Sequence, residues 1–579
     1  MTNNAVLKFY DDAVGMDVEG FNDEEKAKLD EVVTNTDSNV YAWKVGSNLT
    51  PEESGALLSR YSRTSLTGRR LYLNEFLPNR NRGREFFESW LKEYGDDSIQ
   101  EMVGGVPVSC EFVSNLAVKD IEDCRMGSYI EKSSRYVFFD KRLPDGSFMY
   151  YRDPDIMGSF GDEYVRLMDS LFESYVRYTP AMIDYIKGQN RLEDQTFRLG
   201  DASVKISGLT SELAERNGVT DKDLVKAYEN AVKANALDFV RDYLPMSTLT
   251  HVGISMNARS YENLMLKMMA SPLAESRHIG NRIYEELYKV MPSLVQRTKD
   301  EHGMEFIGFL SQRSASTMQA VAGLISGMRP NESGERVDLL DYTGKGSADP
   351  DREAQVAIAA AILHRYGSAY SMRDAMERAN ALTRDELRSL LDAYMGRRKD
   401  RRHKPGRAFE NVDYLFGLQG RVGIYRDLQR HRVGTQERQN FDVRLGFKAR
   451  EAFREIGIAD DYESKMAEAI TLFKRIYERM PYQAQYVVPY GSYATWYYRF
   501  NARQLFHFCE LRTTPAGHPD YRRLVQKVYG AVQSVHPSIA GRMTYINMSE
   551  KTIGRLDSEI RIAMKRSRQV APDQRSVAP

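Results

Sequence analysis

The sequence predicts a helix-rich protein that consists of two related halves. First, apolar residues recur with helical spacing and end at glycine in "GREFFESWLKEYG" (83–95) and again in "DREAQVAIAAAILHRYG" (351–367). Second, a β-prone stretch runs into a helical pattern twice, at 103–118 and at 410–432. Third, the tripeptide Asn-Ala-Arg begins twelve residues after a proline in both halves, at 257–259 and at 501–503. Together these repeats indicate an internal duplication of roughly 250 residues.

The bulk composition limits the class of protein. The 579 residues carry 81 basic and 81 acidic side chains, which argues against a uniformly basic nucleic-acid-binding surface. We find no apolar run long enough for a transmembrane helix, and the start of the chain lacks the pattern of a signal peptide. The three cysteines have spacings typical of neither a zinc site nor a disulfide framework. We therefore expect a cytoplasmic protein with no membrane partner.

The repeat also predicts the domain boundaries. We expect an acidic N-terminal extension over residues 1–50, a first copy over 51–300 and a second copy over 301–550. A basic tail would follow at 551–579. Between the two β-prone stretches, the turn signal Pro-Asp-Gly at 144–146 precedes a long, mainly helical region.

The trio Arg430-His431-Arg432 is a candidate binding site on the edge of the helix predicted after 410–421. Arginine presents a planar fork of donors that matches phosphate or a carbonyl edge. Since neighbouring helix residues point about 100° apart, the trio suits an extended ligand with several acceptors better than one small anion. A solvated basic helix edge is the alternative interpretation of the same residues.

Two further groups of polar residues are candidates. In "FNARQLFHFCELR", Arg503 and His507 share one helix face and Asn501 and Arg512 another, within an apolar surround where polar groups need partners. In "SYIEKSSRYVFF" (128–139), alternating Glu, Ser and Arg at 131, 133 and 135 would point the same way in an extended segment. Ordinary packing contacts and a polar strand edge are the alternatives.

Other signals are weaker. The basic run "GRRKDRRHKPGR" (396–407) is typical of a solvated loop. We find no phosphate-binding GxxxxGK[ST] loop, no HExxH metal motif and no cysteine in a nucleophile signature. We therefore predict no metal site.

At these motifs the sequence resembles the flavin-dependent thymidylate synthases, which methylate dUMP without a catalytic cysteine. That family combines an Arg-His-Arg trio with a Glu-x-Ser-x-Arg-Tyr stretch and a Pro…Asn-Ala-Arg helix that ends in arginine. The resemblance covers most of residues 55–540 as two diverged copies. It implies an α+β fold in which helices pack on a small sheet in each copy, with more helix than strand.

The two copies retain complementary parts of the family signature. The second copy has the trio, but "VGTQERQNFD" (433–442) replaces the Glu-x-Ser-x-Arg pattern. The first copy keeps that pattern and has Asp-Cys-Arg at 123–125 in place of the trio. Likewise, Arg241 has Gln485 as its counterpart, and Arg512 has Met268.

The resemblance implies one composite site with these roles. The catalytic residues would be Arg512, His431 and Arg432. Contacts to the flavin would come from Arg430, His431, Arg432, Asn501, Arg503, His507, Ser65 and Ser98. Contacts to dUMP would come from Glu131, Ser133, Arg135, Arg241 and Arg512.

The resemblance further implies FAD as the cofactor, with NADPH and methylenetetrahydrofolate as co-substrates. Family members are homotetramers, so two fused chains would form a homodimer that imitates a tetramer, with two competent sites. Two alternatives stay open. One is a related flavin- or folate-dependent modification of a pyrimidine nucleotide, and the other is a non-catalytic descendant that binds nucleotide or nucleic acid.

Overall fold

A computed structural model of the chain describes most of its length, and all structural statements below concern the described residues. These are 21–46, 48–49, 51–79, 106–289, 295, 298–329, 332–550 and 553–570. The helix expected at 83–95 lies outside them, and so does Ser98.

The first half is an α+β unit with one four-stranded antiparallel sheet, in the order β1-β2-β6-β3. Its strands are β1 (Val40–Ala42), β2 (Val106–Ser114), β3 (Ser128–Glu131) and β6 (Leu249–Met256), with a separate hairpin of β4 (Phe197–Leu199) and β5 (Ala202–Val204). Its helices are α2 (Asp23–Asp30), α3 (Pro51–Tyr61), α4 (Gly68–Leu71), α6 (Asn115–Ile121), α7 (Pro154–Gln189), α8 (Ser211–Asn217), α9 (Asp221–Val240), α10 (Ala258–Met269) and α11 (Ala274–Tyr288).

The second half repeats this arrangement, with a sheet in the order β7-β8-β10-β9. Its strands are β7 (Arg336–Tyr342), β8 (Asp413–Arg421), β9 (Thr435–Arg438) and β10 (Tyr493–Asn501). Its helices are α13 (Glu301–Leu324), α14 (Pro350–Tyr366), α15 (Met372–Asn380), α16 (Arg384–Met395), α17 (Val422–Leu428), α18 (Glu451–Glu455), α19 (Ala459–Tyr477), α20 (Ala502–Arg512), α21 (Pro519–Val535), α22 (Pro537–Ala540) and α23 (Leu556–Val570).

The duplication predicted from the Asn-Ala-Arg repeat is confirmed by the two sheets. In each half the long third strand ends at the repeated asparagine, and a helix begins at the next residue. The side chain of Asn257 accepts a hydrogen bond from the backbone N–H of Ser260, and Asn501 accepts one from Gln504. Asparagine is a preferred N-cap because its side chain satisfies a helix N–H that has no partner within the helix. The repeated motif therefore marks the same strand-to-helix junction in both halves.

The described parts of the predicted extension (1–50) and tail (551–579), residues 21–46, 48–49 and 553–570, pack on the folded body. Strand β1 pairs with β2, and Tyr41 and Trp43 pack in a core with residues of α3 and α4. At the other end α23 packs against α9, and the Asn230 amide donates a hydrogen bond of 3.2 Å to Glu559. Burial of apolar side chains in these segments keeps them on the body.

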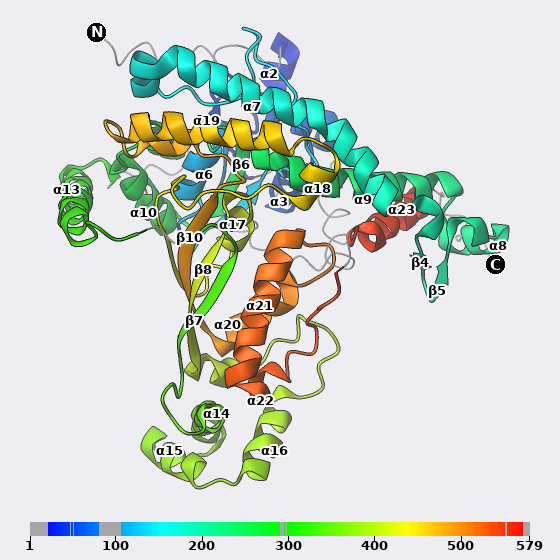
Figure 1. Ribbon diagram of the computed structural model, residues 1–579, viewed down its shortest axis with the longest axis vertical. Helices are drawn as coiled ribbons and strands as arrows, with labels where there is room; N and C mark the ends of the chain where they lie inside the picture. Colours follow the sequence, from blue (N-terminus) through cyan, green and yellow to red (C-terminus); the bar gives the residue numbers. More distant parts are fainter. Residues whose placement is uncertain are drawn as a thin grey trace.

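The two halves join through equivalent segments. Pro245 and Pro489 form an antiparallel bridge, with hydrogen bonds of 2.9 Å from Met246 N to Val488 O and from Tyr490 N to Leu244 O. Beside this junction the long helices α7 and α19 pack together across the top of the molecule (Figure 1). The repeated prolines thus lie on a local two-fold axis between the halves. No helix in the described ranges is long and apolar enough to cross a membrane.

A buried ion network lies beside this junction. The Arg450 guanidinium binds Asp242 of the first half at 2.7 and 2.9 Å and Asp520 of the second half at 2.8 and 3.2 Å. Arg421 donates to the same Asp242 at 2.9 Å. Burial alone would lower the pKa of Arg450, but Asp242 and Asp520 raise it, and the net effect is a rise. Arg450 therefore stays charged.

We predict that Arg450→Ala lowers the free energy of unfolding by about 3 kcal/mol, because it removes one of the two buried cations that Asp242 and Asp520 share. Urea denaturation followed by circular dichroism measures this change. Arg454→Ala is the control, since Arg454 forms a half-exposed pair with Glu451 and should cost no more than about 1 kcal/mol. Equal losses in the two variants would contradict a structural role for the buried network.

Candidate functional site

Glu131, at the end of β3, brings the first half into contact with α17 of the second. Its carboxylate accepts hydrogen bonds from Nη2 of Arg426 and, at 3.4 Å, from Nη2 of Arg430. Lys119 Nζ lies 4.0 Å away. Burial alone would raise the pKa of Glu131, but the cations of Arg426, Lys119 and Arg430 bring it below its usual value. The acidic residue of one half thus meets the trio of the other within one chain.

Arg135 lies at the same junction, behind Glu131. Its Nε donates to Asp238 Oδ2 at 2.8 Å, and its Nη1 donates to the backbone oxygen of Ala516 in the second half at 3.2 Å. Residues 134–136 form a turn after β3, so the extended segment predicted for 131–135 ends at Glu131. In that turn the Ser133 hydroxyl accepts a 3.4 Å hydrogen bond from the backbone N–H of Arg135.

Arg241, just beyond α9, also joins the halves. It donates to the Ser134 hydroxyl at 2.9 Å and to the backbone oxygen of Gly423 in α17 at 3.1 Å. Gly423 and Asp427 lie four residues apart, and so share one face of that helix. The Arg241 guanidinium is therefore placed along the helix face that carries Asp427.

Asp427 is a carboxylate surrounded by arginines at a distance. It has no hydrogen bond or ion pair within 4 Å to any residue of the described ranges. Burial raises its pKa, but Arg241, Arg512, Arg430 and Arg135 lower it far more, so the group stays ionised. Arg135 is paired with Asp238 and Arg430 with Glu131, so the junction gathers several arginines whose charge the local carboxylates only partly balance.

The trio lies just beyond the end of α17, at Leu428, rather than on the helix edge that the sequence predicted. Its three side chains turn to different elements. Arg430 reaches Glu131, while Arg432 Nη1 donates to the Arg125 backbone oxygen at 3.5 Å, and its guanidinium lies 5.7 Å from the Tyr129 ring. The trio thus contacts both halves.

His431, the centre of the trio, is a neutral imidazole. Its Nε2 accepts a 2.7 Å hydrogen bond from Arg512 Nε, and its ring meets the Phe508 ring edge-on at 4.8 Å. Burial, Arg512 and the neighbouring His507 lower its pKa well below the usual value. Since Nε2 accepts from Arg512, the ring proton of the neutral imidazole is on Nδ1.

His507 and the basic run border the same region. Burial, Lys404, Arg512 and Arg401 lower the pKa of His507 to about 3. Residues 396–407 were expected to form a solvated loop. Most of these residues are exposed, as expected, but the Arg398 side chain is buried and donates to Glu510 Oε1 at 2.7 Å, which fixes the loop beside α20.

Three of the predicted flavin contacts lie apart from this cluster. The Asn501 side chain caps α20, and Arg503 donates to Pro405 O at 2.8 Å and to Glu410 Oε1 at 3.1 Å. Ser65 is exposed and makes no hydrogen bond to the residues above. The predicted shared face of Arg503 and His507 therefore has two different sets of neighbours.

Sequence reasoning missed Arg426, Lys119 and Asp427. Arg426 precedes Arg430 by one helical turn, a spacing that places both arginines on the face that meets Glu131. Lys119 occupies the position in α6 that Arg426 has in α17. The i, i+4 spacing was visible in the sequence, whereas contacts between the halves were not.

The reciprocal arrangement does not rebuild this cluster. Arg438 stands where the first half has Glu131, and its Nη2 lies 3.7 Å from Asp120. Gln485 stands where the first half has Arg241, and its Oε1 accepts a 3.0 Å hydrogen bond from Phe441 N. Met268, the counterpart of Arg512, is a buried apolar side chain. The positive region is therefore formed at one of the two related places.

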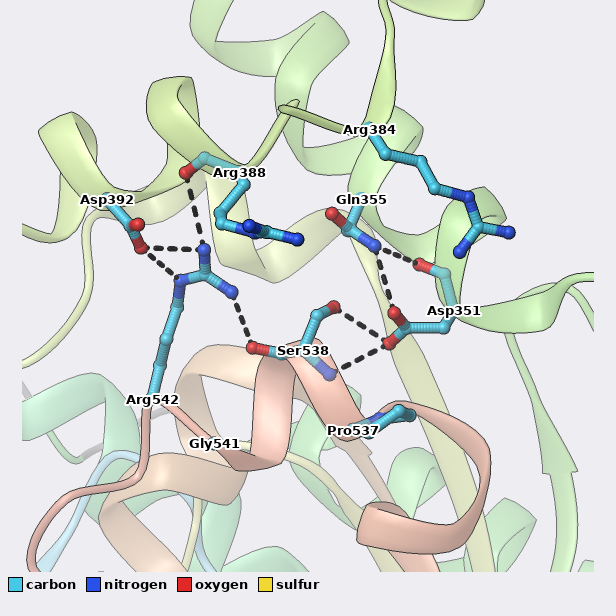
Figure 2. Close-up of a pocket in the computed structure, with 9 residues that line it drawn as sticks. All are labelled: Asp351, Gln355, Arg384, Arg388, Asp392, Pro537, Ser538, Gly541 and Arg542. Atoms are coloured by element: carbon cyan, nitrogen blue, oxygen red, sulfur yellow. Dashed lines mark hydrogen bonds and ion pairs between the residues drawn. The ribbon is translucent and has the colours of Figure 1, made fainter. Parts of the chain in front are cut away.

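Two cavities lie away from this cluster. Figure 2 shows the smaller, about 420 Å³, where Asp351 accepts from Ser538 and Arg542 pairs with Asp392. The larger, about 730 Å³, is lined partly by Arg450 and other residues of the buried ion network. Their charged linings are largely paired internally, and among the described residues no group of His, Cys, Asp and Glu is placed to hold a metal.

His518 next to the cluster provides a pH test. Its Nδ1 accepts from Asp520 N at 3.0 Å and its Nε2 faces the backbone oxygen of Asp238 at 3.2 Å, which fits the neutral ring. Burial lowers its pKa to about 4, although Asp238 opposes the shift. As the pH falls, His518 is therefore protonated in the unfolded chain before it is protonated in the folded protein. The stability that the neutral ring contributes above about pH 6.5 is lost as the pH falls toward 4.

We predict that His518→Asn, which keeps the helix cap, flattens this decline by up to about 1.4 kcal/mol per pH unit. Urea denaturation at several values between about pH 7 and pH 5 measures the slope. Parallel slopes in the variant and the wild type would show that His518 does not take part.

Comparison with known proteins follows the duplication. The family described as "Thymidylate synthase complementing protein" matches residues 47–293 and again 338–538. The chain is 32% identical over 564 residues to a UPF0159 protein of Chlamydia muridarum, covering 93% of this chain and 98% of that one. It is also 32% identical over 522 residues to UPF0159 protein Ta1429 of Thermoplasma acidophilum, and this match covers 89% of this chain and 99% of that protein.

A solved structure, the UMP/dUMP methylase PolB from Streptomyces cacaoi bound with 5-Br dUMP, is 20% identical with a TM-score of 0.28. The matched region covers 37% of this chain and 97% of the PolB chain. Two matches of one family, on the two halves that the sheets define, account for most of the chain. The protein therefore belongs to the thymidylate synthase complementing protein family, and it contains the family domain twice in tandem.

Proposed function

We propose that the protein methylates dUMP to dTMP with FAD, methylenetetrahydrofolate and NADPH, at one site shared by its two halves. The single observation that carries this proposal is the arginine cluster of Arg135, Arg241, Arg426, Arg430 and Arg512, which forms once and only between the halves. Family membership supports the reaction class. A dense set of guanidinium groups suits a nucleotide phosphate, because arginine binds phosphate oxygens in a bidentate manner.

In this proposal the first half binds the phosphate and the second half faces the base. Arg135, Arg241 and the Ser133 hydroxyl supply donors for phosphate oxygens. Glu131 holds Arg426 and Arg430 in place as a positioning residue. Arg512, fixed by its hydrogen bond to His431, directs its remaining N–H groups toward a pyrimidine carbonyl, where they stabilise negative charge that develops on the ring.

The residues around the trio fit a flavin. The buried Tyr498 hydroxyl, Gln436 Oε1 and Arg430 Nε have no hydrogen-bond partner within the described chain, and buried polar atoms without partners are rare. A planar ring with alternating donors and acceptors would satisfy them. When bound, FAD supplies the reducing equivalents that it receives from NADPH, while methylenetetrahydrofolate supplies the carbon and leaves as tetrahydrofolate.

Burial raises the pKa of Cys110 and Cys509, so both thiols stay protonated. The protein's part in the reaction is to bind the nucleotide, orient its base and hold charge, which matches a cofactor-borne chemistry.

We predict that the purified protein retains added FAD and that its visible flavin band shifts when dUMP is added. Arg241→Ala should abolish the shift, because a phosphate donor is lost, while the flavin stays bound. Gln485→Ala, at the equivalent place in the other half, is the matched control and should behave as the wild type. The measurement is an absorption spectrum with and without dUMP.

Loss of retained flavin in a folded protein would contradict the flavin-dependent reaction. Equal effects of Arg241→Ala and Gln485→Ala would contradict a single composite site. Retained flavin without dTMP formation would point to the related pyrimidine modification or to a binding protein.

Asp427 provides a second test, through electrostatics. We predict that Asp427→Asn binds dUMP about tenfold more tightly than the wild type. Removal of an anion about 8 Å from a bound phosphate strengthens the attraction between the arginines and the phosphate by roughly 1–2 kcal/mol. Isothermal titration calorimetry measures the affinity. Asp120→Asn, at the equivalent position of α6, is the control and should leave it unchanged. Weaker binding by Asp427→Asn would instead show that the carboxylate contacts the nucleotide directly.

A further inference from the structure

The loop of residues 396–407, which follows α16, is strongly basic. It contains seven arginine and lysine residues and a single acidic one. Two of the cations pair with glutamates outside the loop, Arg398 with Glu510 and Arg407 with Glu410. Five cations and one carboxylate remain, which gives the loop a net charge of +4, although the whole chain has a formal charge of zero.

Contacts with α20 hold this loop beside the candidate site. Near the start of the loop, Arg398 Nη1 donates to Glu510 Oε1 at 2.7 Å. Near its end, the backbone oxygen of Pro405 accepts a 2.8 Å hydrogen bond from Arg503 Nε. His507 lies between Arg503 and Glu510 along the helix. The loop is therefore fixed at two points, one on each side of a histidine of the site.

The cations between these two points stand at the entrance of the site. Burial is the main cause of the low pKa of His507 and of His431, and the charge of Lys404 contributes to both, with Arg401 adding to the first. Lys404 is nevertheless exposed to solvent. A cation that acts on two imidazoles of the site and also contacts water borders the opening through which a bound ligand would extend into solvent.

Among the ligands of the proposed reaction, the folate co-substrate carries an anionic chain that suits this position. Its pterin end delivers the carbon to the base, and its other end is a glutamate. In polyglutamate forms that end continues as a flexible chain, with one further carboxylate for each glutamate added. Guanidinium and ammonium groups form charge-assisted hydrogen bonds with carboxylates. Several exposed cations in a row match such a chain better than they match the single pyrophosphate of a flavin.

We propose that the loop of residues 396–407 binds the polyglutamate tail of the folate co-substrate at the entrance of the composite site. This inference rests on the proposed function. One short basic loop in a chain of zero net charge favours a short polyanion over nucleic acid, whose binding draws on phosphate contacts across a wide surface. The attraction grows with each added carboxylate and weakens as salt screens the exposed charges.

The test is isothermal titration calorimetry of the full chain, loaded with FAD and dUMP, in the absence of oxygen. The probes are tetrahydrofolate with one glutamate and tetrahydrofolate with five. The wild type should bind the longer form about tenfold more tightly at low salt, and this preference should shrink as the ionic strength rises.

Arg401→Ser with Lys404→Ser should lose the preference, because the two cations nearest to His507 are removed. The matched control, Lys474→Ser with Arg479→Ser, removes the same charge from exposed positions on α19 and just beyond it. Helix α19 lies at the opposite end of the molecule from α16 (Figure 1), so the control should keep the preference. Circular dichroism melting verifies the fold of both variants, and the salt dependence of the wild type tests the proposal without any substitution.

Equal affinity of the wild type for the two forms would overturn this inference and leave the proposed function standing. No binding of either form would overturn both. The inference also fails if the loop variant keeps the preference or if the control loses it. Loss of retained FAD from the loop variant would assign the loop to the flavin pyrophosphate instead. Loop-dependent binding of a single-stranded oligonucleotide, with both folates bound equally, would assign it to nucleic acid.

Discussion

The contact between the two halves at Pro245 and Pro489 is the constraint on which the remaining structure depends. This antiparallel bridge joins the segment that precedes β6 of the first half to the segment that precedes β10 of the second. Two pairings of the candidate site cross that junction directly, Arg241 with Gly423 and Glu131 with Arg426. Because those contacts need positions within a few tenths of an ångström, a small slip of one half would separate the arginines from their partners.

The pairing of buried charges explains how the junction accommodates so many of them. A lone arginine or aspartate there would cost several kcal/mol, since water is excluded. Buried cations there share carboxylates, as Arg421 and Arg450 share Asp242. Asp427 is the exception, an ionised group that contacts none of its four arginines. Such incomplete neutralisation is costly for stability and is typical of functional sites.

Much of the fold was predictable because local patterns determined it. The strand-to-helix transitions near 115 and 422 and the duplication follow from spacing within a short window. The roles of residues 21–49 and 556–570 were not predictable, because burial against distant elements holds them. The trio was found as a motif, but its placement beyond Leu428, and the partners Arg426 and Asp238, depend on contacts between residues about 100 to 300 positions apart.

The exchange of Glu131 for Arg438 has a consequence for how the halves recognise one another. If two second halves paired with each other, Arg438 would face Arg426 and Arg430, and like charges in a buried interface repel strongly. If two first halves paired, Glu131 would lie opposite Lys119 and Asp123 and would lose its contacts with Arg426 and Arg430. Each half is thus electrostatically selective for the other, and a gene that separated them would yield parts able to function only after finding their counterpart.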